Sequence, residues 1–228
     1  MTSSSKLNYF IDKFKFDKHR NIRKKIYKLI SEDQKSFDYG NGYFYQSCER
    51  IGISGLRNTK MRIESLNLSE FTSNKSILDI GTNTGFLLFQ MDNNFHRCEG
   101  IDWNPTLINV ANEVKNYLNI NNIFFHKGDF LKHNFDNNFD LILSLANHTT
   151  YDGGIKDYKE YFQKILKLLK KDGSLILESH HPSIESEDKF NEILNLLKVN
   201  FNMLKKIKYK FFNYADDNRT VLFLKKKS

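Results

Sequence analysis

The sequence predicts an α/β fold with a mostly parallel sheet, helices on both faces and an antiparallel hairpin near the C-terminus. Two observations support this prediction. From residue 76 onward, short apolar runs alternate with segments whose apolar residues recur every three or four positions, which is typical of strands followed by helices. The chain then closes with two strand-like runs, 203–212 and 220–227, joined by the turn-forming residues 214–218.

The elements can be placed in chain order. Residues 7–35 and 58–67 have helical spacing of apolar residues, and between them Gly40 and Gly42 interrupt the pattern. Pro105 suits the first turn of a later helix. The alternating part has expected strands at 76–80, 98–102, 122–128, 139–145 and 174–179, and expected helices at 86–91, 105–118, 155–170 and 187–198.

Composition limits the classes of protein to consider. The chain has 228 residues, of which 39% are apolar, so it can bury a sizeable core as one domain with an appendage. It has no apolar run long enough to span a membrane, and its first residues lack an apolar signal core, so we expect a cytoplasmic protein. Cys48 and Cys98 fit neither a metal site nor a disulfide framework, and we assign no metal.

The formal net charge of +8 is unevenly distributed. Residues 6–28 and residues 198–228 each contain nine Lys or Arg against two Asp or Glu, whereas the middle of the chain is mildly acidic. Basic ends can steer an anionic partner such as nucleic acid, a phosphorylated sugar or a membrane surface. A lysine-rich composition with a solvated basic surface is the simpler interpretation.

The stretch 76–86, SILDIGTNTGF, is the most informative motif. An apolar run ends in an acid, and a glycine turn leads into another apolar run, as where a strand meets a helix beside a nucleotide. Dinucleotide sites use G-x-G-x-x-G, but Asn83 and Phe86 occupy the second and third glycine positions. The Gly-Lys-Ser/Thr of a P-loop is absent as well. What remains is D-x-G-x-N-x-G.

This pattern resembles motif I of the class I methyltransferases, which bind S-adenosylmethionine and usually carry D-x-G-x-G-x-G. Asparagine tolerates a left-handed backbone better than other non-glycine residues, so Asn83 can replace the middle glycine. Asp102, in EGIDWNP, matches the acid that binds both ribose hydroxyls. Asp129 and Phe130, in HKGDF, match the motif that meets adenine, and FDLILSLANH matches the fourth strand. The resemblance covers about residues 70–180 and implies a Rossmann-like fold.

The resemblance also implies roles for individual residues. Gly81 and Gly85 would let the backbone approach the methionine moiety, while the helix beginning near Gly85 would point amides at its carboxylate. A carboxylate at Asp102 would accept two hydrogen bonds from a vicinal diol, and Trp103 would lie against adenine. The further cofactor-binding candidates are Asp79, Thr82, Asn83, Asp129, Phe130 and Ser144.

Residues 43–62, YFYQSCERIGISGLRNTKMR, which we call the lid segment, resemble a pattern seen in methyltransferases that modify bacterial surface polysaccharides or their precursors. In such enzymes the segment folds over the cofactor, so Tyr45, Gln46 and Arg57 become candidates to clamp the methionine end. An ordinary turn with surface arginines is the alternative. We therefore expect a helical cap or lid over residues 1–69 and a cofactor-binding core over residues 70–228.

Candidate catalytic residues follow the fourth and fifth strands, at the edge where parallel strands present a site. His148 is the preferred general base and His180 a second candidate, with Asn147, Glu178 and His181 nearby. Asn147 does not sit in the Asn/Asp-Pro-Pro-aromatic sequence of enzymes that methylate amino groups of DNA bases, which lowers the nucleic-acid hypothesis.

The resulting functional hypothesis is transfer of a methyl group to a hydroxyl or phosphoryl-type oxygen of a surface-glycan precursor, with a phosphoramidate intermediate as one option. Two rivals stay open. One is an RNA- or tRNA-modifying methyltransferase, favoured by the basic ends. The other is a non-catalytic cofactor-binding subunit that supports a partner.

Overall fold

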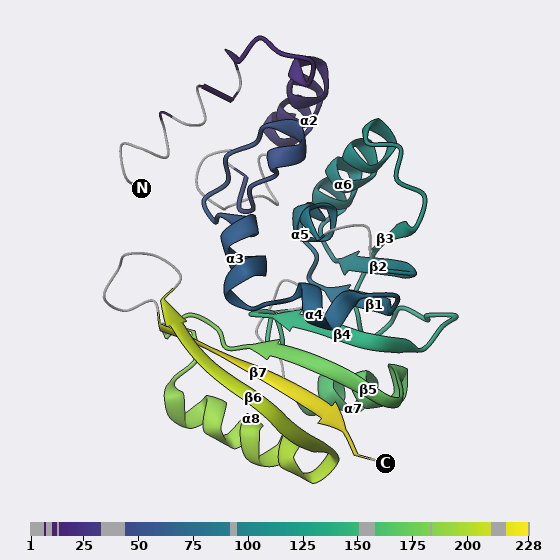
Figure 1. The fold of residues 1–228 in the computed structure, drawn as a ribbon, viewed down its shortest axis with the longest axis vertical. Helices are drawn as coiled ribbons and strands as arrows, with labels where there is room; N and C mark the ends of the chain where they lie inside the picture. Colours follow the sequence, from purple (N-terminus) through teal and green to yellow (C-terminus); the bar gives the residue numbers. More distant parts are fainter. Residues whose placement is uncertain are drawn as a thin grey trace.

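The computed structural model describes residues 7, 11–12, 14–32, 44–91, 95–150, 158–182, 184–210 and 218–227. They form a seven-stranded sheet in the order β3-β2-β1-β4-β5-β7-β6 (Figure 1). The first five strands are mutually parallel, and β7 runs antiparallel to both β5 and β6. The strands are β1 (Ser76–Ile80), β2 (Arg97–Asp102), β3 (Ile123–Lys127), β4 (Phe139–Leu145), β5 (Leu169–Glu178), β6 (Phe201–Lys210) and β7 (Asn218–Lys226).

Helices cover both faces of this sheet (Figure 1). One buried cluster joins one face to α2, α5, α6 and the segment before β1, and a second cluster joins the other face to α7 and α8. The helices are α2 (Arg20–Glu32), the 3₁₀ turn η1 (Glu49–Ile51), α3 (Thr59–Ser65), α4 (Ser69–Thr72), α5 (Phe86–Gln90), α6 (Pro105–Tyr117), α7 (Tyr158–Leu168) and α8 (Glu187–Asn200).

The predicted α/β class, the strand–helix alternation and the closing hairpin are confirmed. Two expectations differ from the structure. The strand expected at 174–179 begins at Leu169, so the helix expected over 155–170 ends at Leu168, and the helix expected over 7–35 is interrupted. The Asp17 carboxylate accepts a hydrogen bond from the His19 backbone N–H at 2.8 Å, and α2 starts anew at Arg20. Gly40, Gly42 and most of the turn at 214–218 lie outside the described residues.

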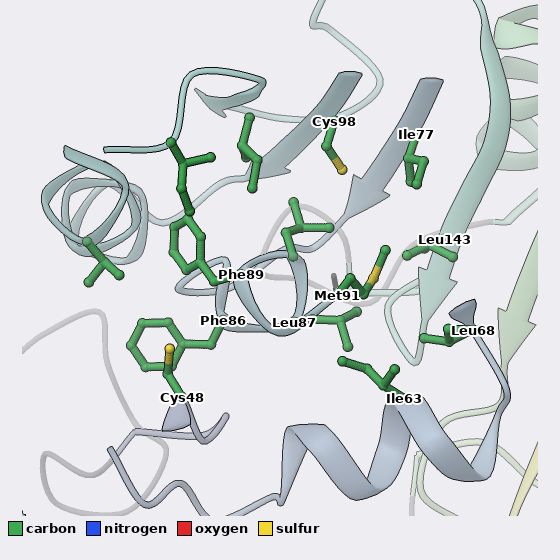
Figure 2. Close-up of a cluster of buried hydrophobic side chains, with 14 of the residues drawn as sticks. Cys48, Ile63, Leu68, Ile77, Phe86, Leu87, Phe89, Met91, Cys98 and Leu143 are labelled. Carbon is green, nitrogen blue, oxygen red and sulfur yellow. The ribbon is translucent and has the colours of Figure 1, made fainter. Parts of the chain in front are cut away.

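The N-terminal segment shares a hydrophobic core with the sheet. Figure 2 shows Cys48 and Ile63 from this segment facing Phe86 and Leu87 of α5, and Ile77 of β1 lies above α5 in this view. All five belong to one buried cluster. Cys48 and Cys98 are both buried free thiols. Because the N-terminal segment and the sheet share this core, the segment packs against the face of the sheet that α5 covers. The boundary near residue 69 stays a prediction.

The position of β7 bears directly on the site. Because β7 is antiparallel to β5, its first residues lie beside the carboxyl end of β5, and the Ser179 backbone N–H donates to the Thr220 carbonyl at 2.9 Å. Side chains near the start of β7 can therefore reach the same edge as the loops that follow β1, β2 and β4. None of the described helices is both long and apolar enough to cross a membrane.

Gly85 should be sensitive to substitution for reasons of packing. Its φ is +70°, and a Cβ added there would lie 2.4 Å from the Phe125 ring. We expect Gly85→Ala to lower the free energy of unfolding by about 1–3 kcal/mol, measured by urea denaturation. The loss of stability should be smaller in a Phe125→Leu background, because the leucine side chain does not collide with the added methyl group. An equal cost in both backgrounds would contradict this explanation.

Candidate active site

A cavity of about 330 Å³ opens where the carboxyl ends of β1, β2, β4 and β5 meet the lid segment. Its wall includes ten of the residues expected from the sequence, and it also includes residues for which no role was expected. The expected ones are Tyr45, Gln46, Asp79, Gly81, Asn83, Asp102, Trp103, Asn147, His180 and His181. The others include Arg62, Asn104, Leu107, Leu145, Ala146, Thr150, Ile184 and Arg219.

The turn after β1 forms one side of the cavity. Gly81 and Asn83 both have left-handed backbones, with φ of 68° and 57°, as the substitution of asparagine for glycine predicts. A Cβ on Gly81 would lie 2.5 Å from the side-chain nitrogen of Asn147. That nitrogen donates to the Ile80 carbonyl, so Asn147 holds the end of β1 against the loop after β4. Glycine is required here because an amide side chain packs directly on it.

Asp102 ends β2 with its carboxylate held by the backbone. One oxygen accepts from the Asn83 N–H at 2.9 Å, and the other accepts from the Asn104 N–H at 3.0 Å. Burial raises the pKa of this carboxyl to about 6, although the two hydrogen bonds lower it. Each oxygen retains lone-pair capacity for another donor, so the geometry suits a vicinal diol that bridges the two oxygens.

Asp79, at the end of β1, is 2% exposed and lines the same cavity. Its Oδ2 atom has no hydrogen-bond partner among the described residues. Burial raises the pKa of the Asp79 carboxyl to about 7. The Thr82 hydroxyl and the charge of Arg62 oppose this shift, and the charge of Asp102 reinforces it. A buried acceptor without a partner fits a ligand that brings a donor, such as an ammonium group.

The lid segment folds tightly and delivers its motif to the cavity. The Cys48 and Ile53 backbones exchange two hydrogen bonds, and the Arg57 N–H donates to the Tyr45 carbonyl at 2.8 Å. The Arg57 guanidinium lies 4.5 Å from the centre of the Tyr45 ring. The Gln46 side-chain oxygen accepts from the Leu87 N–H at 3.3 Å, so it occupies one first-turn amide of α5 that the sequence assigned to the cofactor.

Buried arginines surround the end of β5. Arg62 of α3 forms a close ion pair with Glu178, and Arg57 lies 3.9 Å from the other carboxylate oxygen. Arg219 of β7 donates to the Ser179 carbonyl at 2.9 Å. All three arginines are no more than 6% exposed. Arg62 and Arg219 reach the cavity wall, whereas Arg57 lies behind it.

The histidines expected to act in catalysis occupy different positions. His148 is fully buried and is not part of the cavity wall, and its Nε2 pairs with Glu185 Oε1 at 2.7 Å. His180 does line the cavity, and the Thr149 side-chain oxygen lies 3.0 Å from its Nε2. Burial lowers the pKa of His180 to about 3, helped by the charge of His148. Glu185 also accepts from the His180 N–H at 3.0 Å, so it ties the two loops together.

The remaining expected residues lie behind or beside the cavity. Ser144 is buried. Its hydroxyl donates to Asn147 Oδ1 at 2.8 Å and lies 2.8 Å from the Tyr161 hydroxyl. Asp129 accepts from the Leu131 N–H at 2.8 Å, which makes it a turn cap. Phe130 packs against Tyr161 in the core. The expected residues absent from the cavity wall are Arg57, Thr82, Gly85, Asp129, Phe130, Ser144, His148 and Glu178.

The comparisons with known proteins identify the family. A family model described as a methyltransferase domain matches residues 71–216, which is more than half of the chain. The chain belongs to this family. Fold and family together define a class I S-adenosylmethionine-dependent methyltransferase, so the expected fold and cofactor are confirmed. No curated protein matches the chain.

Solved structures share the fold at low sequence identity. N-methyltransferase NodS from Bradyrhizobium japonicum WM9, in complex with S-adenosyl-L-homocysteine, matches with a TM-score of 0.61 at 16% identity, covering 74% of this chain and 86% of that chain. A SAM-dependent methyltransferase from Aquifex aeolicus gives 0.58 at 16%, covering 75% and 91%. An rRNA methylase from Streptococcus thermophilus gives 0.53 at 13%, covering 77% and 100%. At these sequence identities the structural similarity establishes the fold and does not identify the methyl acceptor.

Cofactor affinity should rise with pH between about 5 and 8. The pKa values of Asp102 and Asp79 are about 6 and about 7 without ligand, and a bound diol or ammonium favours the ionised carboxylates. Binding should therefore release protons near pH 6.5 and release none above pH 8. Calorimetry in buffers of different ionisation enthalpy measures the number of protons released. Asp79→Asn should remove part of the release. An affinity that is flat from pH 5.5 to 8 would contradict the expectation.

The raised pKa values of Asp102 and Asp79 also make the stability of the folded protein depend on pH. Their pKa values in the folded protein are raised from 3.8, so their contribution to stability is fully present below pH 3.8 and is lost as the pH rises through about 6 to 7. Ligand binding offsets that loss, because it supplies the donors that the ionised carboxylates need.

Proposed function

We propose that the protein methylates an oxygen of a sugar- or phosphoryl-containing precursor of a bacterial surface polysaccharide, with a phosphoramidate-type intermediate as one option. The observation that carries the proposal is the resemblance of the lid segment, combined with its position. Tyr45 and Gln46 line the cavity together with Gly81 and Asn83 of the turn after β1. When bound, S-adenosylmethionine supplies an electrophilic methyl group on a sulfonium centre.

The residues of the chain divide the work of binding. In this proposal Asp102 holds the ribose hydroxyls, and Trp103, which is 40% exposed at the cavity wall, covers the adenine. Asp79 receives the amino group, and the lid segment closes over the methionine end. The acceptor enters between the loops after β4 and β5, where Thr150, His181 and Ile184 line the cavity. Catalysis then rests mainly on positioning and on exclusion of water.

The direct test measures binding and transfer separately. We expect S-adenosylhomocysteine to bind in calorimetry and NAD not to bind, because the glycines of a dinucleotide turn are missing. Radiolabelled methyl groups should then be transferred to phosphorylated or nucleotide-activated sugars. Binding of the cofactor product without turnover of any acceptor would favour a non-catalytic subunit instead.

An RNA-modifying activity is the second candidate, and exposed lysines on β6 favour it. Lys205, Lys206 and Lys208 are exposed along this edge strand. If RNA is the acceptor, filter binding of total RNA should weaken steeply with added salt, and the slope should shrink as lysines are removed. Absence of retention at moderate salt would argue against RNA.

A further inference from the structure

The cavity is electrically polarised from one end to the other. At the end formed by β1 and β2, two carboxylates, Asp79 and Asp102, line the wall. At the end formed by α3, β5 and β7, the guanidinium groups of Arg62 and Arg219 line it, and next to them Arg57 and the Glu178 carboxylate, which pairs with Arg62, leave an excess of positive charge. The acidic end suits a cofactor with a diol and cationic groups. The basic end has a different chemistry and calls for a different ligand.

Arg219 is a buried part of this basic end, on the side formed by β5 and β7. It is 4% exposed, stands on the cavity wall, and is fixed by the hydrogen bond to the Ser179 carbonyl directly before His180. The positive charges act on their neighbours. Burial lowers the pKa of Arg57, and Arg62 and Arg219 add to this shift, while Tyr45 and Glu178 oppose it. A guanidinium at a buried wall presents a planar fork that matches an oxyanion.

The neighbouring histidines fit an acceptor that is already anionic. The Thr149 backbone N–H and hydroxyl both lie within 3.4 Å of His180 Nε2, and the pKa of His180 is about 3, so this ring is a poor proton acceptor near neutral pH. His148 is committed to Glu185 outside the cavity wall. A carboxylate or phosphate-type oxygen carries no proton to lose and needs no base.

We propose that the basic end is an oxyanion subsite for the methyl acceptor, in which Arg219 binds a carboxylate or phosphate-type group. This inference rests on the proposed methyltransferase function. The anionic oxygen can itself be the nucleophile: a C–O bond forms as the S–C bond breaks, the bonding pair goes to sulfur, and no proton is released. The subsite defines acceptors as anionic small molecules, with the anion at the β5 and β7 side.

The test measures anion binding by the full chain with S-adenosylhomocysteine already bound. Inorganic phosphate and acetate are titrated separately at constant ionic strength, and the rise in Tm gives an apparent Kd. We expect at least one of them to bind, and the tighter one identifies the acceptor group. Arg219→Gln should weaken that binding at least tenfold while S-adenosylhomocysteine affinity stays within threefold. Lys28→Gln, at an exposed position of α2, removes the same charge and should change neither affinity.

Other outcomes separate the two proposals. If S-adenosylhomocysteine fails to bind the wild-type chain, the proposed function fails. If it binds but abolishes anion binding, the arginines serve the carboxylate of the cofactor and the oxyanion subsite is rejected. Arg219→Lys guards against misfolding, because it keeps the charge and should retain part of the anion affinity. Anion binding to Arg219→Gln at wild-type strength also rejects the proposal.

Discussion

Replacing Asp102 with asparagine should weaken S-adenosylmethionine binding by roughly 10- to 150-fold, which corresponds to about 1.5–3 kcal/mol for hydrogen bonds to a charged group. The carboxylate already accepts the backbone N–H groups of Asn83 and Asn104, one on each oxygen. An amide has only one acceptor oxygen, so the variant must give up a backbone partner or a ribose hydroxyl. Calorimetry with S-adenosylhomocysteine measures the loss.

A matched control separates the role of Asp102 from the general effect of removing an aspartate. Asp140 also accepts a backbone N–H, that of Ser76 at 2.9 Å, but it lies near the start of β4, away from the cavity. Asp140→Asn should leave cofactor affinity within twofold. If folded Asp102→Asn binds as tightly as the wild type, Asp102 does not hold the ribose.

The fold and the turns at the proposed cofactor end of the cavity are predictable because their signals are local. The apolar run before Asp79 and the left-handed positions at Gly81 and Asn83 belong to one short stretch, whose backbone the residues themselves determine. Asp102 follows at the end of the next strand. Local rules for strands, turns and left-handed residues are sufficient in such a stretch.

The basic end, which we propose binds the acceptor, is not predictable in the same way, because residues far apart in the sequence form it. Arg62 in a helix and Arg219 in a strand resemble surface residues in the sequence, and Glu178, which pairs with Arg62, lies 116 residues away from it. Chain order places His148 after β4, which is why the sequence predicts that it acts as a general base. The structure turns its ring toward Glu185, and only a three-dimensional arrangement of the two loops reveals that pairing.

The Glu178 carboxylate should contribute more to stability than either arginine beside it. Glu178→Gln leaves Arg57 and Arg62 buried without this counter-charge, and we expect it to lower the free energy of unfolding by about 3–5 kcal/mol. Arg62→Met should cost less, roughly 1–3 kcal/mol, because Glu178 keeps Arg57 at 3.9 Å. The double variant should cost less than the sum of the two. Urea denaturation of the three variants gives this order.

Glu187→Gln is the control for this comparison, since it breaks an exposed pair with Lys208 at 3.2 Å and should cost less than about 1 kcal/mol.

The ion pairs of Glu178 also bear on the position of the lid segment. Arg57 and Arg62 both belong to that segment and Glu178 belongs to the sheet, so the ion pairs hold the segment over the cavity. Glu178→Gln should therefore speed proteolysis within residues 44–57 under conditions where the chain stays folded. Unchanged cleavage there, with Glu178→Gln no less stable than Arg62→Met, would show that packing of Phe86 and Cys48 alone holds the segment in place.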